Sequence, residues 1–78
     1  MKEFCISVHT VQQVQDFVNL AVRQPFDVLV GDDRQQVSGK NFMGMFTLDL
    51  RQPLHVEVNC DEPSFLQFQK ETAVLLAS

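Results

Sequence analysis

The chain has 78 residues, which allows one domain over residues 1–78 and leaves no room for a second core. Its 6 Lys and Arg residues against 10 Asp and Glu residues give a formal net charge of −4. Nucleic-acid backbones and anionic membrane surfaces select basic proteins, so this balance excludes both as partners. The two His and two Cys residues do not have the close spacing of zinc ligands, so we expect no metal and no cofactor.

No apolar run approaches the length of a membrane span, and no secretory leader pattern follows Met1. We therefore expect a cytoplasmic monomer whose thiols stay reduced.

The first third of the chain predicts a strand followed by a helix. Residues 2–8 alternate, with Phe4, Ile6 and Val8 on an apolar face and Cys5 on the other. The segment 10–13 matches a capping box in which the Thr10 hydroxyl accepts from the N–H of Gln13. Pro25 ends the helix. The apolar stripe expected to face the core consists of Val11, Val14, Phe17 or Val18, Ala21 and Val22.

The rest of the chain predicts a hairpin, a short helix, a strand and a last helix. Residues 26–30 alternate, 31–33 form a turn, and 34–37 form a shorter partner strand. The apolar segment 42–50 predicts one or two helical turns, which Pro53 ends. Residues 54–60 alternate as a fourth strand. Asp61 or Glu62, ahead of Pro63 and Ser64, begins a helix whose inner face carries Phe65, Phe68, Thr72 and Leu75.

The element order is therefore β-α-β-β-α-β-α, an α+β protein. A four-stranded antiparallel sheet with three helices on one face covers every apolar stripe. Cys60 shares the apolar phase of Val56 and Val58, whereas Cys5 is out of phase with Phe4. If the first and fourth strands are neighbours, the two thiols lie on opposite faces and cannot form a disulfide.

Two segments resemble HPr, the histidine-containing phosphocarrier of the bacterial sugar phosphotransferase system. Residues 37–50, VSGKNFMGMFTLDL, are similar to its stretch V-x-(G/A)-K-S-I-M-G-(L/I)-(L/F)-S-L. Residues 17–21, FVNLA, resemble the F-V-x-x-A of its first helix. The resemblance implies an HPr-like open-faced β-sandwich and partners among the proteins of the phosphotransferase system, with roles in sugar transport.

The chemistry of the family does not carry over in the same way. HPr accepts a phosphoryl group on a His in G-L-H-(A/T)-R-P, where a helix N-terminus favours an anion. Counting back from Phe17 places Thr10 at that His, Gln12 at the Arg and Gln13 at the Pro. The regulatory Ser of many members falls on Asn41, which has no hydroxyl. The resemblance thus implies a phosphocarrier-like protein with a degenerate site, a protein-binding or regulatory module and not an enzyme.

Two alternatives remain open. A shift of one residue makes His9 and Thr10 match the H-T of the family motif, which would make His9 the phospho-acceptor of an active phosphocarrier. That shift places Val11 at the Arg position and still supplies no Pro. The other alternative is a protein that retains only the fold of the family.

The short helix is the second candidate site. In HPr it presents an apolar patch that docks partner proteins, and by resemblance Phe42, Met43 and Phe46 form that patch here. A short helix cannot bury all of its apolar residues at once. The alternative is that most of them pack under the last helix.

The remaining polar residues suggest structural roles. His55 alternates outward with Glu57 and Asn59, as on a solvated sheet face. The carboxylates of Asp32, Asp33 and Asp49 suit turns and element ends better than a cation site. Cys5 has no neighbouring base or cation evident from the sequence.

Overall fold

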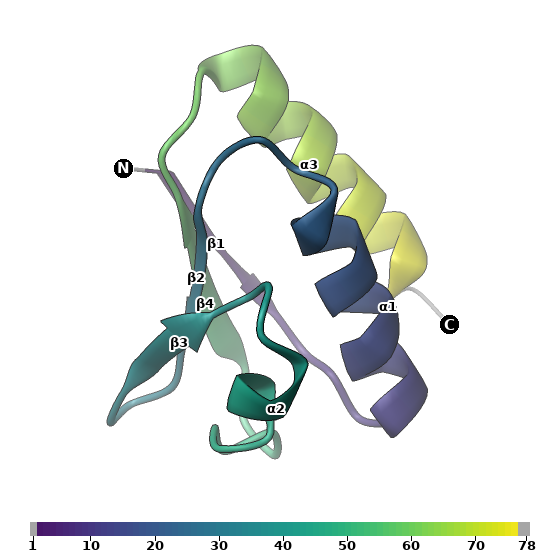
Figure 1. The fold of residues 1–78 in the computed structure, drawn as a ribbon, viewed down its shortest axis with the longest axis vertical. Helices are drawn as coiled ribbons and strands as arrows, with labels where there is room; N and C mark the ends of the chain where they lie inside the picture. Colours follow the sequence, from purple (N-terminus) through teal and green to yellow (C-terminus); the bar gives the residue numbers. More distant parts are fainter. Residues whose placement is uncertain (1, 77–78) are drawn as a thin grey trace.

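A four-stranded antiparallel sheet and three helices make up residues 2–76, the part of the chain that the computed structural model describes (Figure 1). The strand order is β1-β4-β2-β3, and every neighbouring pair is antiparallel. The predicted element order and α+β class are confirmed. The elements are β1 (Lys2–Ile6), α1 (Val11–Val22), β2 (Val28–Gly31), β3 (Gln36–Ser38), α2 (Phe42–Met45), β4 (Leu54–Val58) and α3 (Glu62–Leu75).

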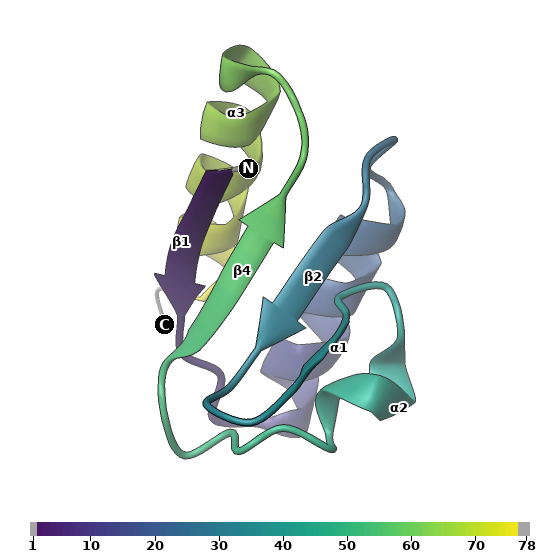
Figure 2. The ribbon, with the colours of Figure 1, turned by 90° about the vertical axis from the view of Figure 1, so that its left-hand side faces the viewer.

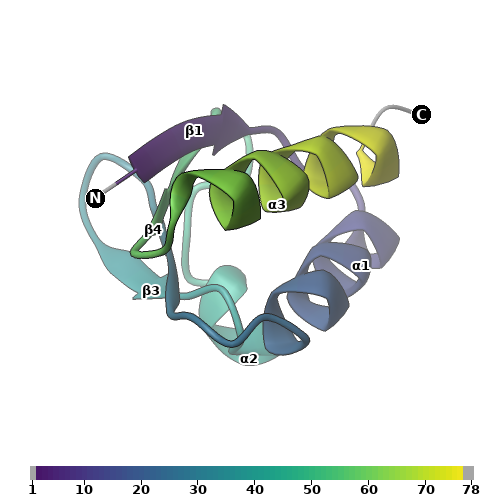
Figure 3. The same ribbon diagram turned by 90° about the horizontal axis from the view of Figure 1, so that it is seen from above.

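The sheet has one covered and one open face. Figure 2 shows the strands in front of the helices, and Figure 3 shows all three helices on the same side of the sheet. Alternate strand residues are buried beneath the helices because side chains of a strand point to opposite faces in turn. These buried strand residues are Ile6, Val28, Val30, Leu54, Val56 and Val58.

Helix α1 begins as the capping box predicts. Thr10 is the N-cap, and its hydroxyl oxygen accepts from the N–H of Gln13 at 3.1 Å. The predicted stripe was wrong at both ends, because Val11 and Val22 are 64% and 56% exposed. The buried face is instead Val14, Phe17, Val18, Leu20 and Ala21.

Helix α3 packs against β1 and α1 on the covered side of the sheet. Asp61 is its N-cap and accepts from the N–H of Ser64 at 3.2 Å, as the Asp-Glu-Pro-Ser start predicts. Phe68 and Thr72 are fully buried on the predicted inner face. The Phe68 ring lies against Phe4, Phe17 and Phe26, with ring centroids 5.7 to 6.2 Å apart.

All four strands differ from the prediction at a boundary: β2 covers Val28–Gly31 rather than residues 26–30, and β4 ends at Val58 rather than at residue 60. β1 ends at Ile6, although Val8 beyond it is still fully buried. β3 covers Gln36–Ser38 rather than residues 34–37. The carboxylate of Asp32 accepts from the N–H groups of Arg34 and Gln35 at 2.8 and 2.9 Å. These donors belong to the turn, so the strand starts after them.

The cysteines lie as the strand phases predict. β1 pairs with β4, Cys5 is exposed on the open face, and Cys60 packs partly buried against the core. Both thiols are free, which confirms the prediction that they do not bridge. Within residues 2–76, no helix combines the length and the apolar character needed to cross a membrane.

Candidate functional site

The first candidate site is the start of α1. His9 is exposed and precedes the N-cap Thr10, and its backbone N–H donates to the Gln13 side-chain oxygen at 2.6 Å. Within residues 2–76, its imidazole takes part in no hydrogen bond or ion pair. Thr10 and Gln13, which the sequence comparison aligns with the His and Pro of the HPr motif, accept from the N–H groups of Gln13 and His9, respectively. The N–H of Gln13 is therefore satisfied by the chain itself.

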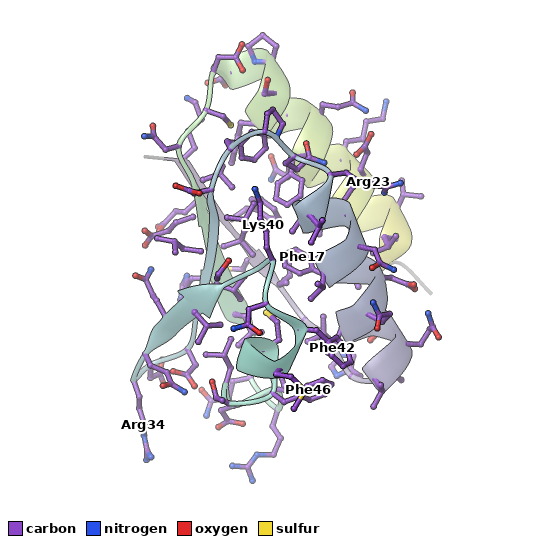
Figure 4. All side chains as sticks on the ribbon, in the orientation of Figure 1. Phe17, Arg23, Arg34, Lys40, Phe42 and Phe46 are labelled. Carbon is purple, nitrogen blue, oxygen red and sulfur yellow. The ribbon has the colours of Figure 1, made fainter. Side chains whose placement is uncertain are left out.

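Positive charge is lacking at this helix start. The first turn of α1, residues 11–14, carries no charged side chain. Gln12, at the family Arg position, donates from its side chain to Asp16 at 2.8 Å. Arg23 lies at the C-cap of α1 and Arg34 in the β2–β3 turn, both away from the helix start in Figure 4. A phosphate at this position would thus meet the helix dipole and, one turn further on, the Asp16 carboxylate, with no guanidinium from the first turn of α1.

The segment between β3 and α2 is held by hydrogen bonds of its own. The Lys40 ammonium donates to the backbone carbonyl of Gln24 at 3.0 Å, which links the approach to α2 with the C-terminal end of α1. Asn41, at the family Ser position, is the N-cap of α2 and accepts from the N–H of Gly44 at 3.1 Å. Ser and Asn are both favoured N-caps, so Asn41 retains the cap without a hydroxyl.

The segment before α2 needs a glycine at position 39, because a side chain there would collide with the core. A Cβ at Gly39 would lie 2.8 Å from Val28 Cγ1 and 3.2 Å from the Phe17 ring. The backbone therefore passes directly over the core before α2 begins. The glycine of the Gly-Lys pair is a packing requirement here.

The second candidate site is α2 itself. Its apolar residues divide between core and surface: Met45 and Leu48 are buried, whereas Met43 is 72% and Phe46 40% exposed. Phe42 is partly buried and contacts Phe46 edge to face, with ring centroids 5.0 Å apart. We call Phe42, Met43 and Phe46 the α2 patch.

The α2 patch lies beside the helix that begins with Thr10. α2 packs against α1 and β3, and Figure 4 shows Phe42 and Phe46 on the side of α2 near α1. Burial under the last helix, the alternative interpretation, does not describe the two exposed members of the patch. The two candidate sites are thus neighbours on one surface.

The three aspartates have the structural roles expected of them where contacts are seen. The second carboxylate oxygen of Asp32 accepts from the N–H of Asp49 at 2.9 Å, and Asp49 forms an ion pair with Arg51 at 3.1 Å. Hydrogen bonds to backbone N–H groups, first that of Arg34, lower the pKa of Asp32. Within residues 2–76, no group of His, Cys, Asp and Glu side chains is arranged to hold a metal ion.

His55 and Cys5 differ from the sequence expectation in one respect. His55 is exposed on the open face, as predicted, but it lies directly opposite Cys5 in the β1–β4 register. The Cys5 sulfur is 3.5 Å from Nδ1 of His55. The expectation that Cys5 has no neighbouring base was wrong, because pairing between strands 50 residues apart is not visible from local sequence.

Comparison with solved structures decides the fold. The chain superposes along 100% of its length on 93% of the crystal structure of HPr-C-His from Thermoanaerobacter tengcongensis, with a TM-score of 0.78 and 23% sequence identity. This chain has the HPr fold. No protein-family model and no curated protein sequence matches the chain. The sequence around the α2 patch resembles the HPr stretch described above, whereas the sequence at the start of α1 departs from the HPr motif.

Proposed function

We propose that this protein is a phosphocarrier-like binding module that docks a protein of the phosphotransferase system through the α2 patch without carrying a phosphoryl group. The observation that carries the proposal is the contrast between its two neighbouring sites. The α2 patch keeps exposed apolar side chains, whereas the start of α1 lacks the acceptor His and the cation of the family motif. A monomer in the cytoplasm is part of this proposal.

The argument for docking rests on the shape of α2. Met45 and Leu48 fix the helix to the core, so Met43 and Phe46 stay exposed on a short, anchored element. Flexible Met and flat Phe side chains together make an adaptable apolar contact surface. Asn41 and Lys40 hold the helix start by hydrogen bonds, which reduces the ordering needed on binding.

The argument against phosphoryl transfer rests on the cap of α1. Thr10 and Gln13 hydrogen-bond to the helix N-terminal region, and Gln12 is engaged with Asp16. An anion here would compete with the Thr10 cap and approach the Asp16 carboxylate. Residues 10–14 contain neither a guanidinium nor an imidazole that could bind the phosphate.

The part of the proposal that concerns phosphoryl transfer is tested by mass spectrometry. The protein is incubated with phosphoenolpyruvate and the first enzyme of the phosphotransferase system from the same organism, and its intact mass is measured. We expect no added phosphate. An acid-labile gain of one phosphate that His9→Ala abolishes would establish the alternative, an active phosphocarrier that uses His9.

The part of the proposal that concerns docking is tested by a binding measurement with the same enzyme. Isotope-labelled protein is titrated with the same enzyme without phosphoenolpyruvate, and amide shifts are followed by NMR. We expect the shifted amides to cluster on α2 and at the start of α1. We expect the Met43→Asp variant to bind the enzyme with at least tenfold lower affinity. Val74→Asp is the matched control, because Val74 on α3 is 73% exposed and Met43 is 72% exposed. Equal loss in both variants, or no binding by the unmodified protein, would contradict the docking proposal.

A further inference from the structure

A thiol and an imidazole meet on the open face of the sheet, away from α2. Cys5 on β1 and His55 on β4 are paired in register, both are exposed, and the sulfur lies 3.5 Å from Nδ1. All three helices are on the other side of the sheet, as Figures 2 and 3 show. A nucleophile and a base within hydrogen-bond reach form the arrangement in which a thiol loses its proton to an imidazole.

Two carboxylates accompany this pair. Glu3 and Glu57 are opposite each other at the next outward-facing register position, and neither makes an ion pair within residues 2–76. From β2, the residues paired with Glu57 and His55 are Leu29 and Gly31, which do not titrate. Among the described residues of β1, β4 and β2, the titratable groups at the outward-facing register positions around Cys5 are therefore His55, Glu3 and Glu57.

The second cysteine provides a contrast within the same chain. Cys60 is partly buried against the core, and no imidazole hydrogen-bonds to it among the described residues. Burial, followed by the charge of Asp61, raises the pKa of the Cys60 thiol. Cys60 is thus the less reactive thiol against which Cys5 can be measured.

We propose that Cys5 is a thiol–disulfide exchange site, activated by His55, that reacts with small disulfides bearing cationic groups. In the exchange, the Cys5 thiol transfers its proton to Nδ1 of His55, and the thiolate attacks one sulfur of the disulfide. A new S–S bond forms to Cys5 and the S–S bond of the reagent breaks. The departing thiolate takes up the proton held by His55, so the products are a mixed disulfide on Cys5, a neutral His55 and one small thiol.

The preference for cationic disulfides follows from Glu3 and Glu57. Both carboxylates lie at the outward-facing register position next to that of Cys5, so they attract positive groups to this face and repel negative ones. Cystamine, which carries two amines, is the probe of the matching charge. Glutathione disulfide, which is anionic, is the probe of opposite charge.

The experiment measures the rate of mixed-disulfide formation at each cysteine of the folded, full chain. Proteolytic cleavage after Arg23 and Arg51 places Cys5 and Cys60 on separate peptides. The masses of these peptides are measured by mass spectrometry without a reducing agent, so that the mixed disulfides stay intact. With cystamine at neutral pH, we expect Cys5 to react about tenfold faster than Cys60. We expect His55→Ala to lower the rate of mixed-disulfide formation at Cys5 several-fold and to leave the rate at Cys60 unchanged. Equal rates at the two thiols, or an unchanged Cys5 rate in His55→Ala, would overturn the proposal.

A further measurement tests the charge preference. The double variant Glu3→Gln, Glu57→Gln should reduce the ratio of the cystamine rate to the glutathione disulfide rate at Cys5. An unchanged ratio would overturn the charge preference. Circular dichroism of each variant verifies that the sheet is intact.

Discussion

Single side chains before each helix satisfy backbone groups that would otherwise lack partners. Thr10, Asn41 and Asp61 each accept from the N–H group three residues further on, at 3.1, 3.1 and 3.2 Å. At α1 the cap has a second part, since Gln13 accepts from the backbone of His9. The side chains that the sequence comparison aligns with the HPr phospho-acceptor motif therefore hold the helix start. Their structural role is sufficient to explain their presence.

This role predicts a measurable loss of stability in Thr10→Ala. Removal of the hydroxyl leaves the N–H of Gln13 without its partner, so we expect the free energy of unfolding to fall by about 1 kcal/mol. Urea denaturation followed by circular dichroism measures the change. Thr10→Ser keeps the hydroxyl and should stay close to the unmodified protein. A Ser variant as unstable as the Ala variant would show that the hydroxyl is not the source.

At the scale of elements, one buried aromatic residue connects α3 to several parts of the fold. The buried Phe68 ring contacts three other Phe rings, from β1, from α1 and from the segment before β2. The opposite face of α3 carries Leu66, which is 53% exposed. Phe68 thus links segments that the chain separates widely.

Phe68→Leu should therefore cost about 1–2 kcal/mol of unfolding free energy, because the smaller side chain leaves part of the ring volume empty. Leu66→Ala on the exposed face should change it by less than about 0.5 kcal/mol. Both values come from the same urea titration. Similar losses in the two variants would contradict the inner face assigned to α3.

The elements also show how far the sequence reaches. Alternation and capping signals predicted the strands, the helix starts and the HPr-like order, because these depend on neighbouring residues. The buried face of α1 was predicted wrongly at Val11 and Val22, since the angle at which a helix meets a sheet fixes its inner face and depends on tertiary packing. For the same reason, the contact of Cys5 with His55 and that of Lys40 with Gln24 required the structure.

At the scale of the whole molecule, the Asp32 carboxylate joins two segments that are separated along the chain. Asp32 in the β2–β3 turn accepts from Arg34, Gln35 and Asp49, so one side chain joins the hairpin to the loop after α2. Hydrogen bonds lower the pKa of Asp32, Arg51 lowers the pKa of Asp49, and hydrogen bonds from Ser64 lower the pKa of Asp61. The ionised forms of these groups are favoured in the folded state.

The sign of these shifts fixes the pH dependence of stability. A carboxyl whose pKa is lower in the folded state stabilises the fold fully above its unfolded pKa, near 3.9, and this contribution is lost as the pH falls through the folded pKa. We therefore expect the free energy of unfolding to be steady around neutral pH and to decline below about pH 5. Urea titrations at a series of pH values measure this decline.

Asp32→Asn tests whether Asp32 contributes to that decline. Asn lacks the charge and keeps one acceptor oxygen, so it can accept from the turn N–H groups or from the N–H of Asp49 but not from both. The variant should therefore be less stable than the unmodified protein at neutral pH. The difference should shrink as the pH falls, because protonation makes Asp32 neutral in the unmodified protein as well. Asp33→Asn is the control, since the exposed Asp33 accepts no hydrogen bond from the described residues. A stability gap in Asp32→Asn that does not change with pH would mean that the geometry of the turn, and not the charge of Asp32, joins the hairpin to the loop after α2.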